Sequence, residues 1–173
     1  YGASSDSPYH LGWQGRSPMG PQVWAAPHPS HLSIVGPVAL GRARAARDAG
    51  RNILPIVLHT DAAFAGQGVN GEMLQLSELP AFTVEGTVHL ILNNQIGFTT
   101  DMDDARTSRS CADYGKLVEA PILHVNGEDP EALCRAAKAA VAYRNRFKAD
   151  VVVECIGYRR RGHNEIDEPR STQ

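Results

Sequence analysis

Two polar residues, Asp61 and Asn94, each stand just after a short apolar run that is typical of a buried strand. If the two strands are neighbours in a sheet, about 4.8 Å apart, both side chains project into one crevice. Mg²⁺ takes six oxygen ligands, of which a protein usually supplies only one or two carboxylates. A carboxylate from Asp61, an amide oxygen from Asn94 and the backbone carbonyl of Ile96 would leave positions open for phosphate oxygens. The spacing therefore predicts a site for magnesium and a diphosphate.

The residues that follow Asp61 favour the same chemistry. Ala62, Ala63, Gly66 and Gly68 have almost no side chain to obstruct a ligand. The free amides at the start of the next helix would face the negative charge of a diphosphate. A simpler interpretation remains open, in which Asp61 only caps a helix and Asn94 only forms a turn.

The run 66–71 spells GxGxxG, which offers a second functional hypothesis, a nicotinamide-dependent oxidoreductase. In a dinucleotide-binding fingerprint the first glycine follows the strand directly, and an acidic residue ends the second strand. Here the residues 59–65 intervene, and the second strand ends in two asparagines. The fingerprint is therefore the weaker of the two interpretations.

Strands and helices that alternate along the chain must position these residues. From residue 53 onward, apolar β-branched runs alternate with Ala-rich or amphipathic segments. We expect strands at 53–59, 87–93, 121–125 and 150–158, and helices at 37–50, 69–79, 112–119 and 130–147. This order predicts an α/β fold, a parallel sheet with helices on both faces. Residues 1–32 are expected to form a loop-rich active-site segment, and 33–173 an α/β module that binds the diphosphate.

Composition excludes several functional classes. The 173 residues carry a formal net charge of −2, which gives no electrostatic footprint for nucleic acid or an anionic membrane. No apolar run approaches the roughly 20 residues of a membrane-spanning helix. Three widely spaced cysteines fit neither a disulfide framework nor a zinc site and favour a reducing compartment. The chain begins without Met and stops outside any expected element, so we expect a piece of a larger protein.

Beyond these single residues, whole segments resemble a known family. HTDAAFAGQG followed by LNNQIGFTTD is similar to the diphosphate-and-metal motif of thiamine-diphosphate enzymes, in the form found in the first, decarboxylating component of the 2-oxoglutarate dehydrogenase complex. The segments APILHVNGEDPEA and DVVVECIGYRRRGHNEIDEP resemble the same family in the same order. The resemblance covers roughly residues 30–173, and it implies a thiamine-diphosphate-binding fold.

The resemblance also implies roles for particular residues. Asp61, Asn94 and the Ile96 carbonyl would hold Mg²⁺, and Ala62 and Ala63 would offer backbone contacts to the diphosphate of thiamine diphosphate. The cofactor would decarboxylate a 2-oxo acid, and the acyl group would pass to a lipoyl-bearing succinyltransferase partner. Such an enzyme is expected as a homodimer in a multienzyme complex of the tricarboxylic acid cycle. Its place would be the bacterial cytoplasm or the mitochondrial matrix.

Three histidines match the active-site histidines of this family, namely His10, His31 and His163. An imidazole changes charge near neutral pH and can donate to a carboxylate or an alkoxide. By contrast, His59 and His89 lie in or beside apolar strands, where a hydrogen-bonded core histidine is the expected role.

Several positions depart from the family pattern. Thr60 replaces a usual Gly, His28 an Asn and Ser33 a Glu, and the stretch 108–113 diverges. These changes leave 2-oxoadipate open as the substrate, and also a non-catalytic remnant of the fold. The family's activating glutamate belongs to a second module that these residues do not match, so we expect the isolated chain to be inactive.

Overall fold

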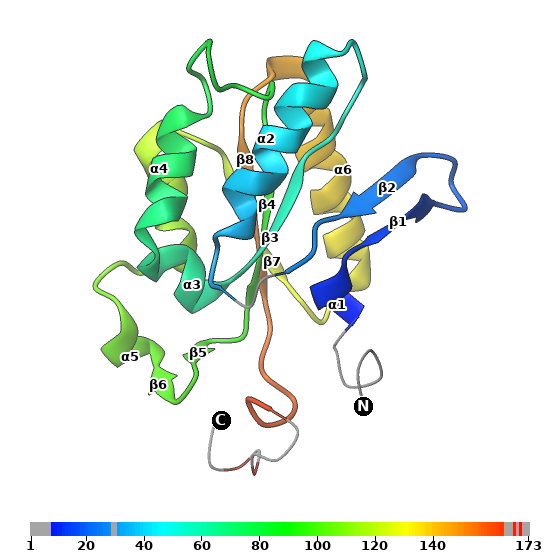
Figure 1. Ribbon diagram of the computed structural model, residues 1–173. Coiled ribbons are helices and arrows are strands. Elements are labelled where there is room, and N and C mark those ends of the chain that lie inside the picture. The colour runs from blue at the N-terminus through cyan, green and yellow to red at the C-terminus, as the bar shows by residue number, and fades with distance from the viewer. Residues whose placement is uncertain (1–7, 29–30, 165–167, 169, 171–173) are drawn as a thin grey trace.

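The computed structural model describes residues 8–28, 31–164, 168 and 170 (Figure 1). Its centre is a four-stranded sheet in the order β3-β4-β8-β7. The strands are β3 (Ile56–Thr60), β4 (Val88–Asn93), β7 (Ile122–Asn126) and β8 (Val151–Ile156), and every neighbouring pair runs parallel. The predicted parallel α/β sheet is confirmed. The strands that precede Asp61 and Asn94 are neighbours, with Thr60 paired to Leu92.

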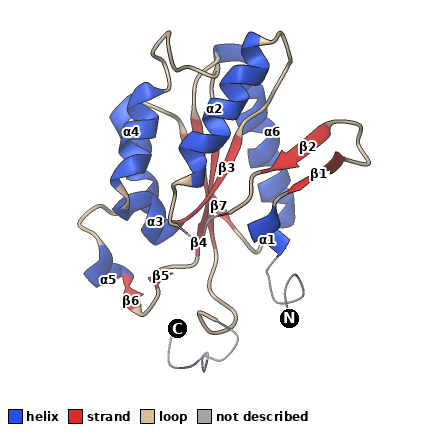
Figure 2. Ribbon diagram, in the orientation of Figure 1, coloured by secondary structure: helices blue, strands red, loops and turns tan. Residues whose placement is uncertain are grey.

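Helices cover both faces of this sheet, as predicted (Figure 2). One core joins the sheet to α3 (Asp61–Gly66), α4 (Gly68–Leu76) and the 3₁₀ helix η1 (Cys111–Val118). The opposite core joins it to α6 (Pro130–Phe147). Alternation along β8 explains this arrangement, because Val152 belongs to the first core while Val151 and Val153 belong to the second.

The face that α6 covers is only partly closed. Ile56 and Leu58 of β3 point to this face and are 57% and 60% exposed. The helix packs mainly on β7 and β8, so the part of this face formed by β3 is left uncovered by α6.

The N-terminal segment is more regular than predicted. Within its described residues the structure contains the short helix α1 (Pro8–Leu11) and an antiparallel hairpin of β1 (Trp13–Arg16) and β2 (Gln22–Ala25). Gly and Pro punctuate this hairpin within the segment expected to be loop-rich rather than prevent it; Gly20 supplies a positive φ of 105° in its turn. The hairpin also contacts α2 (Val35–Asp48), where the guanidinium of Arg42 lies 3.7 Å from the centre of the Trp24 ring.

The other predicted elements differ from the structure mainly at their ends. The helix α6 begins as expected, since the Asp129 carboxylate accepts a hydrogen bond from the Ala132 amide at 2.8 Å. The helix expected at 112–119 is present as the 3₁₀ helix η1. Sequence analysis did not predict α3, nor the small hairpin of β5 (Ile96–Gly97) and β6 (Thr100–Asp101), nor α5 (Met102–Ala105).

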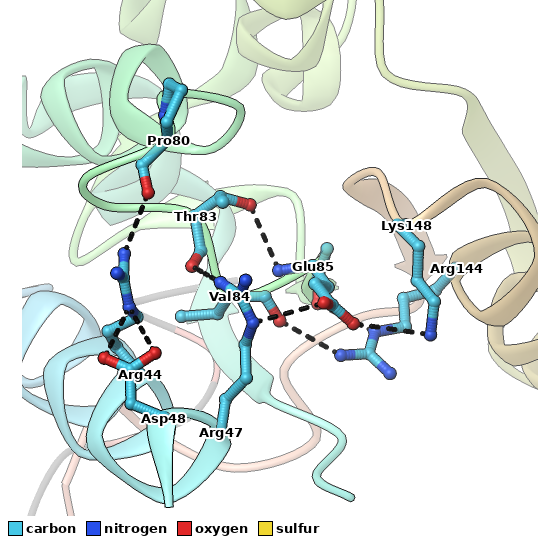
Figure 3. Close-up of polar contacts among 10 residues, drawn as sticks. Arg44, Arg47, Asp48, Pro80, Thr83, Val84, Glu85, Arg144 and Lys148 are labelled. Atoms are coloured by element: carbon cyan, nitrogen blue, oxygen red, sulfur yellow. Dashed lines mark hydrogen bonds and ion pairs between the residues drawn. The ribbon is translucent and has the colours of Figure 1, made fainter. Parts of the chain in front are cut away.

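Arginine side chains bind the loop that precedes β4, at the amino end of the sheet (Figure 3). The buried guanidinium of Arg144 donates to the carbonyls of Gly86 and Val84 at 2.9 and 3.2 Å. From α2, Arg47 donates to the Thr83 carbonyl and pairs with Glu85. This network lies at the end of the sheet away from Asp61, so its role is to hold α2, α6 and the loop together.

Candidate active site at the carboxyl ends of the strands

Asp61 is the first residue of α3, directly after β3. Its side chain is only 2% exposed. Burial raises the pKa of this carboxyl, while hydrogen bonds from the amides of Ala62 and Asp61 itself and the positive charge of Arg106 act in the opposite direction. Burial thus opposes ionisation of Asp61 more strongly than these neighbouring groups favour it.

The turn after β4 holds the second predicted ligand. The carbonyl oxygen of the Asn94 side chain accepts a hydrogen bond from the Ile96 amide at 3.1 Å. Gln95 and Phe98 have φ values of 64° and 56°, which residues other than glycine rarely adopt. Backbone strain of this kind persists only where the surrounding structure enforces it, and it gathers at functional sites.

Asp61 and the Asn94 turn belong to one place in the structure. The turn packs against the start of α3, because a Cβ added to Gly97 would lie 3.0 Å from the Cβ of Ala62. Added Cβ atoms at Gly66 and Gly68 would meet nothing within 4 Å. The small residues Ala62 and Gly97 thus allow the two segments to meet. The small residues Gly66 and Gly68 leave open space beside them. The structure brings together the two segments that the sequence assigned to one crevice.

Arg106, which follows α5, was not singled out from the sequence. Its positive charge acts on the pKa of Asp61. Its Nε atom is buried and has no hydrogen-bond partner among the described residues. No local sequence pattern distinguishes an arginine in a binding site from an arginine on the surface. The position of Arg106 near Asp61 is therefore visible only in the fold. Its unused donor is suited to an anionic oxygen.

Glu154, in the middle of β8, is a second residue that sequence analysis missed. Its side chain is 2% exposed and accepts hydrogen bonds from four side chains. These donors are Asn93, Ser110, Cys111 and His124. Burial alone would raise the pKa of Glu154, but the four hydrogen bonds together lower it. The signal available in the sequence was a single carboxylate inside the apolar run VVVECI.

His163 lies beside the Asn94 turn. Its ring makes an edge-on contact with Phe98, with ring centres 4.6 Å apart. The guanidinium of Arg159 donates to the Phe98 carbonyl at 2.5 Å and contacts the Nδ1 atom of His163 at 3.2 Å. The chain after β8 and the chain after β4 therefore meet at the same end of the sheet.

The other two predicted catalytic histidines, His10 and His31, belong to the N-terminal segment. The Nδ1 atom of His10 lies 2.8 Å from the carbonyl oxygen of His28. His31 has an exposed side chain in the turn before α2, and its carbonyl accepts a hydrogen bond from the Ile34 amide. His10 and His31 remain predictions, in a segment partly outside the described residues.

His59 and His89 are core histidines, as predicted. The Nε2 atom of His59 lies 3.1 Å from Nδ1 of His89, whose Nε2 lies 3.3 Å from the Asp150 carboxylate. Burial, together with the neighbouring His89, lowers the pKa of His59 to about 3. In one consistent arrangement, Nε2 of neutral His59 donates to Nδ1 of His89, and Nε2 of His89 donates to Asp150.

The dinucleotide-binding hypothesis does not fit the fold. Gly66 ends α3 and Gly68 begins α4, so a complete helix separates the strand from the GxGxxG run. In the fingerprint the glycine-rich turn joins the strand directly to the helix that faces the pyrophosphate.

Two features are absent from the described part of the chain. No helix there is long and apolar enough to cross a membrane. Likewise, no group of three or more His, Cys, Asp or Glu side chains within the described ranges is arranged to hold a metal ion. The magnesium site predicted from the sequence uses a single carboxylate with an amide and a backbone carbonyl.

A parallel sheet with polar residues at the carboxyl ends of adjacent strands is typical of enzymes that bind a phosphorylated ligand there. A family model described as "Dehydrogenase E1 component" matches residues 19–173. The chain belongs to this family.

The chain is also similar to individual curated proteins. It is 46% identical over 179 residues to the 2-oxoglutarate dehydrogenase E1 component of Azotobacter vinelandii, with 98% of this chain and 19% of the relative covered. It is 48% identical to the multifunctional 2-oxoglutarate metabolism enzyme of Mycolicibacterium vanbaalenii, covering 98% of this chain and 15% of the relative. A mitochondrial 2-oxoglutarate dehydrogenase-like protein of Rattus norvegicus is 52% identical over 84% of this chain and 15% of its own length. The chain thus spans less than a fifth of each of these relatives.

Proposed function

We propose that this chain is the diphosphate- and magnesium-binding part of a thiamine-dependent 2-oxo acid dehydrogenase that acts on 2-oxoglutarate. The observation that carries the proposal is the contact between the start of α3 and the turn after β4, where Gly97 approaches Ala62. The relatives support the substrate, because their names include 2-oxoglutarate dehydrogenase E1 component.

The residues present fit a magnesium-bound diphosphate. Asp61 supplies a buried carboxylate and Asn94 an amide oxygen, and together with the Ile96 carbonyl they would hold Mg²⁺. The backbone at Ala62 and Ala63, at the start of α3, would contact the diphosphate. Arg106 offers a buried donor that has no hydrogen-bond partner among the described residues.

Thiamine diphosphate, when bound, supplies the electron sink that lets a 2-oxo acid lose carbon dioxide. The protein's own residues bind the cofactor and orient it. The metal ligands fix the diphosphate, and the close contact of Ala62 with Gly97 holds the two binding segments together. We assign His163 to the reacting end of the site, where it donates or accepts a proton beside Phe98. His10 and His31 are proposed to act on the substrate from the N-terminal segment 1–32. The α/β module that binds the diphosphate is proposed to comprise residues 33–173.

Further parts of the proposal rest on the family resemblance of the sequence. A lipoyl-bearing succinyltransferase would accept the acyl group, and the protein would act as a homodimer in the bacterial cytoplasm or the mitochondrial matrix. A 2-oxoadipate substrate remains the second candidate, because Ser33 departs from the family pattern next to His31.

Calorimetry on the native protein tests the proposal. Thiamine diphosphate should bind only with Mg²⁺ present, NAD should not bind, and Asp61→Asn should weaken cofactor binding at least tenfold. Asp129→Asn is the matched control, because Asp129 is also a carboxylate at the start of a helix at this end of the sheet and Asn caps a helix as well as Asp. Binding that is equally tight in both variants and in the wild type would refute the proposal.

A further inference from the structure

The candidate metal ligand Asn94 stands next to Asn93, whose side chain is 5% exposed and points into the protein. The two amide ends of Asn93 have different partners. Its Nδ2 atom donates to Glu154 at 2.7 Å, and its Oδ1 atom accepts from the Gln95 amide at 2.9 Å. Asn93 thus links the core of the sheet to the turn that carries Asn94 and Ile96.

Glu154 determines which way this amide points. An ionised carboxylate only accepts hydrogen bonds, so it must face the NH₂ end of Asn93. The other end of the amide is then an oxygen, which is what the Gln95 amide requires. If Asn93 turned over, its NH₂ group would face the Gln95 N–H, and two donors would meet.

The remaining contacts of Glu154 keep its carboxylate in place. One oxygen, Oε1, accepts from Asn93 and from the Cys111 thiol at 3.0 Å, and Oε2 accepts from the Ser110 hydroxyl at 2.8 Å and contacts His124. The four donors come from three segments of the chain, namely β4, β7 and the start of η1 with its N-cap residue Ser110. In this geometry Glu154 and Asn93 lie behind Asn94 and Ile96 and are not themselves placed to bind the cation.

We infer that Glu154 is a positioning residue for the metal site, acting through Asn93 to hold the 94–97 turn in the conformation that presents Asn94 and Ile96 to the cation. This inference rests on the proposed function, since it deepens the assignment of that site. It accounts for the positive φ of Gln95, whose amide is fixed by Asn93. Residues behind the direct ligands commonly change metal affinity by about 10- to 100-fold when they are removed.

The test uses the native protein and the variants Asn93→Leu, Glu154→Ala and their combination. Asp150→Ala is the matched control, because Asp150 is also a buried carboxylate that accepts from a backbone amide and a histidine, at the amino end of β8. Two quantities are measured. The first is hydrogen exchange of the Gln95 amide without cofactor, and the second is the affinity for Mg²⁺ in the presence of thiamine diphosphate.

Each single variant should speed exchange at Gln95 at least tenfold and weaken Mg²⁺ binding at least tenfold. The double variant should be no worse than Asn93→Leu within about threefold, because residues that act through one contact are not additive. Asp150→Ala should lower the melting temperature but leave both quantities within about threefold. Unchanged exchange at Gln95 in Glu154→Ala, or additive losses of affinity, would overturn the inference.

Two further outcomes are separable. If Glu154→Ala does not fold, the variants Asn93→Leu and Glu154→Gln test the inference instead. In Glu154→Gln the side-chain oxygen can still face Asn93, and the NH₂ group can face the Ser110 hydroxyl. Protection of Gln95 should then survive in Glu154→Gln and vanish in Asn93→Leu, and the reverse would overturn the inference. If the wild type fails to bind magnesium and the cofactor, the proposed function fails, while the exchange of Gln95 still reports whether Glu154 orders the turn.

Discussion

Gly97, in the turn after β4, lies so close to Ala62 at the start of α3 that a Cβ on Gly97 would be 3.0 Å from the Cβ of Ala62. Carbon atoms prefer a separation of about 3.5–4.0 Å, so the two segments could not keep this contact if either carried more bulk there. The contact joins the two stretches that the sequence predicted to hold a diphosphate and its metal.

Gly97→Ala should therefore push the turn away from α3. We expect magnesium-dependent cofactor affinity to fall at least tenfold, with a loss of stability of about 1–3 kcal/mol, typical of overpacking. Calorimetry and urea unfolding measure the two effects. Gly86→Ala is the contrasting variant, because Gly86 has a φ of 87° and an added Cβ would lie 2.4 Å from the Ala149 carbonyl oxygen. It should destabilise the protein more without a direct effect on affinity in the molecules that fold.

His163→Gln should separate binding from turnover. If His163 transfers a proton at the reacting end of the site, its loss should lower kcat by about 10²- to 10⁴-fold and leave the affinity for magnesium and thiamine diphosphate within a few-fold. Steady-state kinetics with 2-oxoglutarate, beside calorimetry, measure both. A loss of cofactor binding with unchanged kcat would show instead that the contact with Phe98 only supports the turn.

Cys111 should be the least reactive of the three thiols. Burial and the neighbouring Glu154 raise its pKa, whereas Cys134 is exposed. Only the thiolate reacts readily with alkylating reagents, so we expect Cys111 in the folded protein to react at least about a hundredfold more slowly than Cys134. Peptide mapping after a short exposure to iodoacetamide measures the ratio. Comparable labelling of both would contradict the buried contact of the Cys111 thiol with Glu154.

Stability should depend on pH through Glu154. Its pKa is lowered from the ordinary value of 4.5, so folding favours the ionised form. The resulting stabilisation is complete above pH 4.5 and is lost as the pH falls through the lowered pKa, by at most about 1.4 kcal/mol per pH unit. The difference in unfolding free energy between wild type and Glu154→Gln should therefore shrink below pH 4.5.

Urea unfolding at several pH values between 7 and 3 measures this difference. Asp113→Asn serves as the surface control, since the pKa of Asp113 is lowered by exposed Lys116. Its effect should stay within about 1 kcal/mol at every pH, as is usual for surface ion pairs. A difference for Glu154→Gln that grows on acidification would contradict the buried hydrogen-bonded carboxylate.

The sheet could be predicted because its strands are local patterns. Each strand is a short apolar run, and Asp129 with Pro130 marks the start of α6 by rules that act over a few residues. The order β3-β4 followed from the connections, since consecutive strands with a helical crossover usually pair or lie close together. The placement of Asp61 beside the Asn94 turn followed from the same topology.

What escaped prediction depends on contacts between distant segments. Glu154 reads as one charge in an apolar strand until β4, β7 and η1 bring four donors to it. Arg106 gains its significance only from its proximity to Asp61. The hairpin β1–β2 was missed because its glycines and prolines resemble those of an irregular loop.

The most direct test of the metal site is a crystal structure of the native protein with thiamine diphosphate and Mn²⁺ in place of Mg²⁺, with the metal located by its anomalous scattering. We predict one strong peak about 2.0–2.3 Å from oxygen atoms of Asp61, Asn94 and the Ile96 carbonyl, with diphosphate oxygens completing the shell. A metal peak elsewhere, with Asp61 and Asn94 not bound to it, would contradict the account.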